Sequence, residues 1–261
     1  MRPSIITLTT DFGLSDPYVG TMKGVILSRC PEATIVDISH GVPPYSVMVG
    51  AYTIDQAAPY YPPGTVHVVV VDPGVGTDRR PMMAEALEQY FVAPDNGVLS
   101  LLLRRDSRAR CRELSNESLW LRDRSNTFHG RDIFAPVAAY LASGQALAND
   151  MGRELYLPVT ADEWEPVQQG PDLWRGMVLN VDRFGNVITN FRTAHFGHRL
   201  KVGFSLEKIS DLRATFAGAE PGKCFVFSGS SSYLEIGMNQ GSAAEHLGLR
   251  PGNAVHLQIA R

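Results

Sequence analysis

The hydrophobic pattern divides the chain into two parts of different character. In the first part, short apolar runs that suit strands alternate with longer segments whose apolar residues recur at helical spacing. Three such alternations predict a parallel sheet with right-handed crossovers. The expected strands are 5–10, 34–38 and the run from 65; the expected helices are 18–30, 47–60, 97–105 and 133–141; and a hairpin is expected from 83–87 and 90–93.

The pattern changes in segment 156–174, which contains three prolines and keeps neither a helical nor a strand period. Beyond it, short strand candidates separated by turn residues predict a small antiparallel barrel or sandwich. We therefore expect an α/β N-terminal domain with a mainly parallel sheet at 1–160, a linker at 161–174, and a smaller C-terminal antiparallel β-barrel-like domain at 175–261. The expected C-terminal elements are strands 176–181, 187–191, 200–204, 224–227, 233–236 and 255–259, and a helix at 243–247.

The most informative stretch is the valine run 68–71, which ends at Asp72 and a Pro-Gly pair. It reads as a buried strand that delivers a carboxylate to its C-terminal end, where open α/β sheets bind ligands. Gly74 and Gly76 allow a tight turn, and Arg79 is close enough along the loop to fold back towards Asp72. An equally weighted alternative is that Asp72 caps a turn and Arg79 is a solvated surface charge.

Two other segments carry candidate chemistry for the same sheet edge. Asp11 follows the first strand, and His129 lies in the glycine-containing loop 128–132 before an apolar helix. An acid, an arginine and a histidine on one edge can orient and deprotonate a water molecule. A lone histidine is usually structural or merely exposed, and sequence spacing does not show that the three side chains meet.

Two loops of the second part have a structural and a functional interpretation. Loop 182–186 fits a hairpin in which Gly and Asn supply positive φ angles, yet Phe184 and Asn186 could stack on and hydrogen-bond a heteroaromatic ring. The serine-rich segment 228–232 could donate to a carboxylate, but a flexible polar turn is favoured.

Composition narrows the class of ligand. The 261 residues carry a net charge of −3, which gives no broad electropositive face for nucleic acid, so a small-molecule ligand is expected. The three cysteines are far apart and in no metal-ligand spacing, which predicts reduced thiols, no zinc site and a cytoplasmic protein. We expect no signal peptide and no membrane-spanning segment. Neither a Walker A loop nor a dinucleotide-binding fingerprint is present.

Five motifs in order along the chain resemble those of the S-adenosyl-L-methionine (SAM) hydroxide adenosyltransferases, or SAM hydrolases. The resemblance implies an α/β N-terminal domain, a β-barrel-like C-terminal domain, and a homotrimer that binds SAM between one subunit's N-domain and a neighbour's C-domain. It implies SAM as substrate, adenosine as product, and no cofactor or metal. The motifs are Thr9-Thr10-Asp11-Phe12-Gly13 with Asp16, Val71-Asp72-Pro73-Gly74-Val75-Gly76, Phe128-His129-Gly130-Arg131-Asp132, Phe184-Gly185-Asn186 and Tyr233-Leu234-Glu235-Ile236.

By this resemblance, Asp72, Arg79 and His129 match the family's water-activating triad. The related SAM-dependent halogenases carry tyrosine in place of both Asp72 and His129, and the fluorinase has serine in place of Gly130. They also contain an inserted N-domain loop for which segment 79–95 leaves no room. The chain therefore resembles the hydrolase branch.

The resemblance also implies nine substrate-binding residues, which divide by the part of SAM that they contact. They are Asp11 for the ribose diol; Asp16 and Asp182 for the methionine amine; Tyr45, Phe184, Phe216 and Asn186 for the adenine; and Ser230 and Ser231 for the methionine carboxylate, where Ser231 replaces the fluorinase's arginine and a backbone contact is expected.

The expected reaction is in-line attack of water on C5′ of SAM, which yields adenosine and L-methionine. Our hypothesis is that Asp72 and His129 orient the water and accept its proton, while Arg79 fixes the carboxylate and stabilises developing negative charge. Two alternatives remain: a chlorinase-type halide adenosyltransferase on the same scaffold, and a non-catalytic SAM or adenosine sensor.

Overall fold

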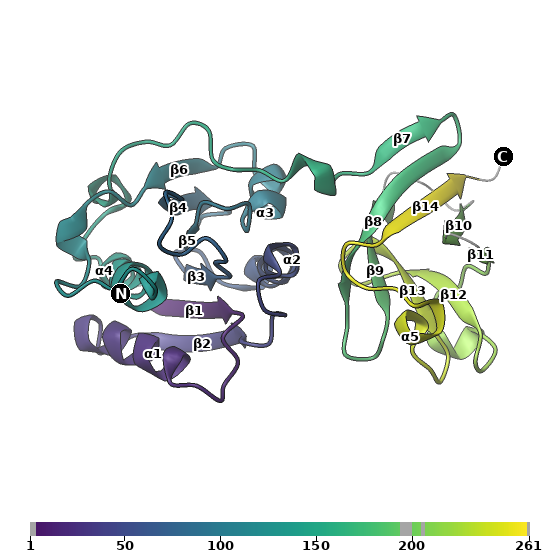
Figure 1. Cartoon of the computed structure of the whole chain (residues 1–261), viewed down its shortest axis with the longest axis horizontal. Coiled ribbons are helices and arrows are strands. Elements are labelled where there is room, and N and C mark those ends of the chain that lie inside the picture. Colours follow the sequence, from purple (N-terminus) through teal and green to yellow (C-terminus); the bar gives the residue numbers. More distant parts are fainter. Residues whose placement is uncertain (1–3, 194–199, 205–206, 260–261) are drawn as a thin grey trace. The chain divides into compact units, whose positions relative to one another are not determined.

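The computed structural model describes residues 4–193, 200–204 and 207–259, with side chains omitted between 194 and 208. The chain separates into two compact units, 1–161 and 162–261, each with its own sheet (Figure 1). Segment 161–174, which the sequence predicts as a linker, contains β7 (Val167–Gly170) and the start of β8 (Leu173–Val181). These two strands pair, so the second sheet begins within that segment.

The first unit alternates strands with helices, as the sequence predicts. Helix 18–30 is confirmed, helix 97–105 is shorter than expected, and the segment from 133 begins as a π-helical turn, Gly130–Phe134, before it becomes α-helical. The strands are β1 (Ile5–Thr10), β2 (Thr34–Ser39), β3 (Val66–Val70), β4 (Pro81–Ala86), β5 (Gln89–Pro94) and β6 (Arg110–Glu113); the helices are α1 (Tyr18–Arg29), α2 (Val47–Ala57), α3 (Ser100–Arg105) and α4 (Ala135–Ser143).

The sheet of this unit is mixed, so the expected parallel pairing holds for only part of it. Its order is β2-β1-β3-β5-β4-β6, with parallel pairing from β2 to β5 and antiparallel pairing of β4 with both neighbours. Leu87 and Glu88, both at positive φ, form the two-residue turn from β4 to β5. So short a connection allows only antiparallel pairing.

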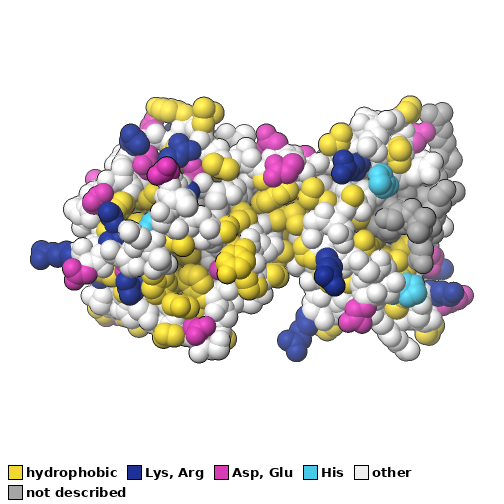
Figure 2. Space-filling view, in the orientation of Figure 1, with side chains coloured by type: hydrophobic (Ala, Val, Ile, Leu, Met, Phe, Trp, Pro, Cys, Tyr) yellow, Lys and Arg dark blue, Asp and Glu magenta, His cyan; other side chains and the backbone are white. Residues whose placement is uncertain are grey.

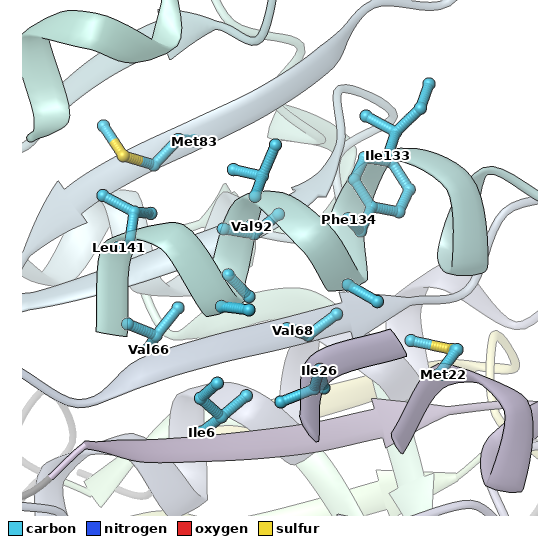
Figure 3. Packing of buried hydrophobic residues seen from close by; sticks show 14 of the residues in the cluster. Ile6, Met22, Ile26, Val66, Val68, Met83, Val92, Ile133, Phe134 and Leu141 are labelled. Atoms are coloured by element: carbon cyan, nitrogen blue, oxygen red, sulfur yellow. The ribbon is translucent and has the colours of Figure 1, made fainter. Parts of the chain in front are cut away.

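Helices cover both faces of this sheet. Because side chains alternate along a strand, Val66, Val68 and Val70 of β3 pack against α1 and α4, while Val69 and Val71 belong to the core formed with α2 and α3. Figure 1 shows the two helix pairs on opposite sides of the strands, and Figure 3 shows β3 side chains meeting Met22 and Ile26 of α1. The unit is a three-layer α/β/α fold.

The strand order places a topological switch point between β1 and β3. The chain leaves β1 through α1 to β2 on one side, and after α2 it returns as β3 on the other side. Ligands of open α/β sheets bind at the carboxyl ends of the strands at such a point. Asp11 and Asp72 follow β1 and β3 at this edge.

The second unit is an antiparallel sheet of order β11-β10-β14-β8-β9-β13-β12, with β7 beside β8. The expected barrel does not close, because among the described residues no strand pairing joins β11 to β12. After β11 the chain forms an isolated parallel bridge to β12, between Leu212 and Val226. The remaining elements are β9 (Val187–Arg192), β10 (Leu200–Phe204), β11 (Glu207–Ile209), β12 (Cys224–Ser228), β13 (Tyr233–Met238), β14 (Ala254–Ile259) and α5 (Ala243–Leu247).

The expectations from composition concern surface charge, membrane-spanning helices and the state of the cysteines. On the face shown in Figure 2, acidic and basic side chains are interspersed, with no extended region of one charge. No helix within the described ranges is both long and apolar enough to cross a bilayer. Cys30, Cys111 and Cys224 are free thiols.

Candidate active site

A pocket of about 350 Å³ opens at the switch point of the first unit. It contains four of the residues predicted from sequence, drawn from loops after three strands and from the start of the π-helical turn. The lining residues are Asp11, Phe12, Tyr18, Pro44, Tyr45, Val70, Asp72, Val75, Thr127, Phe128, His129 and Gly130.

Arg79 folds back onto Asp72 as the sequence suggested. Its Nε donates to Asp72 Oδ1 at 2.9 Å, and its Nη2 donates to Asp72 Oδ2. Only 8% of the Arg79 side chain and 5% of the Asp72 side chain are exposed, so the pair is not a solvated surface contact. Two parallel hydrogen bonds fix the plane of the carboxylate. Asp72 lines the pocket and Arg79 lies behind it.

His129 is joined to the same guanidinium. Arg79 Nη2 lies 2.8 Å from His129 Nδ1, and an arginine can only donate, so Nδ1 is the acceptor. Burial first, and the neighbouring positive charge of Arg79 second, lower the pKa of His129. The neutral ring therefore carries its proton on Nε2.

The two loops that supply these three side chains touch each other. Gly76, at φ +79°, packs so closely that a Cβ atom there would lie 2.5 Å from the carbonyl oxygen of Asn126. Nearer His129, the buried carboxylate of Asp132 accepts a hydrogen bond from the backbone N–H of Ser125 at 2.8 Å and pairs with Arg131. The position of the histidine thus depends on close loop packing.

Asp11 belongs to a short turn, residues 11–13, which we call the Asp11 turn. Its Oδ2 accepts a hydrogen bond from the backbone N–H of Tyr45 at 2.8 Å. Tyr45 has φ +68°, a strained conformation for a bulky residue, and the residue is 74% exposed. Asp16 is exposed and is not among the residues that line the pocket.

Three aromatic pocket residues were not singled out as site residues. Phe12, Tyr18 and Phe128 form a cluster with ring centroids 5.2 to 5.9 Å apart. The signal that could have found two of them is adjacency, since Phe12 follows Asp11 and Phe128 precedes His129. Tyr18 fits the helical period of α1, which conceals its role in the pocket.

In the second unit, Asp182 organises the loop between β8 and β9. Its Oδ1 accepts from the backbone N–H groups of Phe184 and Asn186, and its Oδ2 accepts from the Asn186 side chain at 2.8 Å. Gly185 adopts φ +82°, as expected for the hairpin, whereas Asn186 does not have a positive φ. This arrangement leaves Phe184 79% exposed.

The remaining predicted residues are in different surroundings. Ser231 Oγ donates to Glu235 Oε1 at 3.3 Å, and burial, opposed by this bond, raises the pKa of Glu235. Ser230 is exposed in the same turn. Phe216 packs against Phe225 and Phe227 at centroid distances of 5.1 and 5.2 Å. Phe216 thus belongs to an aromatic cluster of the second unit.

Metal ligands do not gather in the part of the chain that the structure describes, where no group of three or more His, Cys, Asp or Glu side chains is placed to hold an ion. A larger cavity of about 430 Å³ lies beside α3 and β6, bounded by segment 154–160, and contains none of the predicted site residues.

Comparison with known proteins gives concordant matches over both units. The model of the SAM hydroxide adenosyltransferase N-terminal domain matches residues 6–151, and that of the C-terminal domain matches residues 176–256. An (R)-S-adenosyl-L-methionine hydrolase of Thermus thermophilus is 40% identical, over 98% of this chain and 100% of the relative. A fluorinase of Nocardia brasiliensis is 29% identical, over 99% and 98% of the two chains.

Among solved structures, an uncharacterised conserved protein of Thermotoga maritima superposes with a TM-score of 0.88 at 36% identity. The match covers 97% of this chain and 99% of that one.

Proposed function

Because the chain belongs to the SAM hydroxide adenosyltransferase family, we propose that it hydrolyses SAM to adenosine and L-methionine. The observation that carries the proposal is the pairing of Asp72 and His129 in one pocket, both held by Arg79 from behind. The relative at 40% identity is named for this reaction, and the two polar side chains are the groups it needs to handle a water molecule.

The reaction places few demands on the protein. As water attacks C5′, the new C–O bond forms, the C5′–S bond breaks, and its electron pair returns to the sulfonium, which leaves as neutral methionine. One proton must be taken from the water. The leaving group needs no activation, so no cofactor or metal is proposed, and alignment of the water supplies much of the rate.

The roles within the triad follow from which groups can donate. Asp72 accepts the proton, because its carboxylate is the acceptor that faces the pocket. His129 donates from Nε2 to the water oxygen, since its Nδ1 is occupied by Arg79. This refines the hypothesis that both residues accept the proton. Arg79 positions the other two from outside the pocket.

We extend the substrate assignments from the family resemblance. Asp11 is proposed to hold the ribose diol, Tyr45 to stack on the adenine, and Asp16 with Asp182 to hold the amine. Ser231 is proposed to contact the methionine carboxylate through its backbone, because its hydroxyl is used by Glu235. Phe184, Phe216 and Asn186 are proposed adenine contacts and Ser230 a carboxylate contact.

We also propose a homotrimer in the cytoplasm. The trimer is supported by the division of the proposed substrate contacts between two compact units. Three free cysteines support a reducing compartment. Sedimentation equilibrium of the full chain tests the trimer directly, and a monomer would contradict it.

The test of the activity is incubation of the purified protein with SAM, following adenosine and methionine by chromatography. Equal amounts of both, unaffected by chloride, are expected, and Asp72→Asn should lower turnover by about 10²- to 10⁴-fold. Formation of 5′-chloro-5′-deoxyadenosine would indicate a halogenase instead. Binding of SAM without turnover would indicate a sensor.

A further inference from the structure

Behind the Asp11 turn lies a chain of polar side chains that the proposed reaction does not use. Thr10, fully buried at the end of β1, accepts a hydrogen bond from the backbone N–H of Phe12 at 3.2 Å. The Thr10 hydroxyl lies 2.8 Å from His40 Nδ1, and the His40 carbonyl oxygen accepts from the N–H of Gly13 at 2.8 Å. Thr10 and His40 therefore hold two of the three residues of the turn.

The outer end of the chain is anchored by charge. His40 Nε2 lies 3.0 Å from Asp37 Oδ1, and Lys23 Nζ lies 2.6 Å from Asp37 Oδ2. The Asp37 carboxylate can only accept, so Nε2 carries the proton on that side, and in the neutral ring Nδ1 accepts from the Thr10 hydroxyl. His40 Nε2 lies close to Asp37 without the geometry of an aligned hydrogen bond, so this contact is electrostatic.

The turn connects this chain to both halves of the pocket. The Asp11 carboxylate accepts a hydrogen bond from the backbone N–H of Tyr45. The Phe12 ring contacts the ring of Phe128, the neighbour of His129. A displacement of Phe12 would move the wall of the pocket that adjoins the triad.

We propose that Thr10 and His40 are positioning residues that hold the Asp11 turn in the geometry needed to bind the ribose of SAM. The inference rests on the proposed function, because that function assigns the ribose to Asp11. Neither side chain is among the lining residues, so both act through the turn.

The same strand provides a matched control. Thr7 Oγ1 lies 2.7 Å from His67 Nδ1, and both residues are fully buried. This pair resembles Thr10 and His40 in chemistry and burial, but neither residue touches the Asp11 turn or the pocket. Thr7→Val and Thr10→Val each replace a buried hydroxyl by a methyl group at similar volume.

The experiment measures SAM kinetics and hydrogen exchange of segment 11–13 in wild type and in both valine variants. Thr10→Val is expected to raise the KM for SAM about fivefold or more, to leave kcat within about threefold, and to accelerate exchange in the segment by a similar factor. Thr7→Val is expected to change neither, although both variants lose thermal stability.

Two further variants distinguish the contact that His40 makes with Thr10 from the contact that it makes with Asp37. His40→Asn places an amide where Nδ1 stands and can keep the Thr10 contact, whereas His40→Gln reaches towards Asp37 and loses Thr10. A KM near wild type for His40→Asn and a raised KM for His40→Gln support the proposal, and the reverse order overturns it.

The outcomes distinguish this proposal from the proposed function. Unchanged exchange in Thr10→Val refutes the positioning role whether or not SAM is hydrolysed. Faster exchange with an unchanged KM refutes its link to substrate binding. If wild type does not hydrolyse SAM, the proposed function fails, and the Kd for adenosine replaces KM as the binding readout.

Discussion

Replacement of Gly76 by alanine tests whether the close contact between the loops that carry Asp72 and His129 sets the geometry of the proposed triad. Gly76 lies between Asp72 and Arg79, and its backbone faces the carbonyl oxygen of Asn126, three residues before His129. The added Cβ would lie 2.5 Å from that oxygen. Since non-bonded heavy atoms settle at about 3.5 Å, the loops must separate by about 1 Å.

The effect on activity should exceed the effect on stability. At φ +79°, an alanine costs about 1–2 kcal/mol in backbone strain. A 1 Å displacement between Arg79 and His129 would stretch their 2.8 Å contact beyond hydrogen-bond range. Misplacement of this size lowers turnover by about 10²-fold. We therefore expect a large loss in kcat in a protein that still folds.

Gly74→Ala is the matched control, because Gly74 is in the same loop without a positive φ. A Cβ there would meet the Arg79 and Thr77 side chains at 3.4 Å, an ordinary contact. The assay is steady-state SAM hydrolysis by wild type and both variants, together with thermal unfolding. If kcat of Gly76→Ala is within about threefold of that of Gly74→Ala, the loop contact does not set the triad geometry.

Three other predictions concern His129, Arg79 and His67. Protonation of His129 would remove the hydrogen-bond acceptor for Arg79, so kcat/KM should fall as the pH is lowered. The midpoint of this fall should lie below pH 6.5, with kcat/KM constant at higher pH, and a midpoint above pH 6.5 would contradict the prediction. Arg79→Lys loses the two parallel hydrogen bonds to Asp72 and should lower kcat about 10- to 100-fold. KM should change little, because Arg79 lies outside the pocket lining, and a change confined to KM would contradict this. Burial lowers the pKa of His67 to about 4, so on acidification the unfolded state binds a proton at higher pH than the folded state does. Chemical denaturation should therefore show that the free energy of unfolding falls by up to about 3 kcal/mol between pH 6.5 and 4. His67→Gln should abolish this pH dependence.

The strands and helices that form the cores were predictable because each carries its own period. The valine run of β3 and the helix 243–247 were predicted within a few residues. Two of the missed strands, β6 and β7, are four-residue segments, Arg-Cys-Arg-Glu and Val-Gln-Gln-Gly, with little apolar alternation. Such short strands are stabilised by hydrogen bonds to a neighbour, which local sequence does not reveal.

The candidate site divides in the same way. The sequence identified Asp11, Asp72 and His129 as polar residues at the ends of apolar segments, which is a local property. It left open whether Arg79 would be a surface charge, because its burial depends on a loop 50 residues away in sequence. The Thr10–His40 contact likewise joins two strand ends that are adjacent only in the folded sheet.

The sequence by itself thus determined the hydrophobic period of each helix and strand, the turns, and the residue types at the strand ends. These features depend on side-chain pattern and backbone preference, which act over a few neighbouring residues. Only the tertiary structure decided that the predicted β4–β5 hairpin joins the sheet of the parallel strands, which makes that sheet mixed, and that the second sheet stays open. It also decided that His129 presents Nδ1 to Arg79, which makes the histidine a donor towards the pocket. These outcomes depend on strand pairing and loop packing between distant segments, where a few hydrogen bonds and one glycine contact select the arrangement.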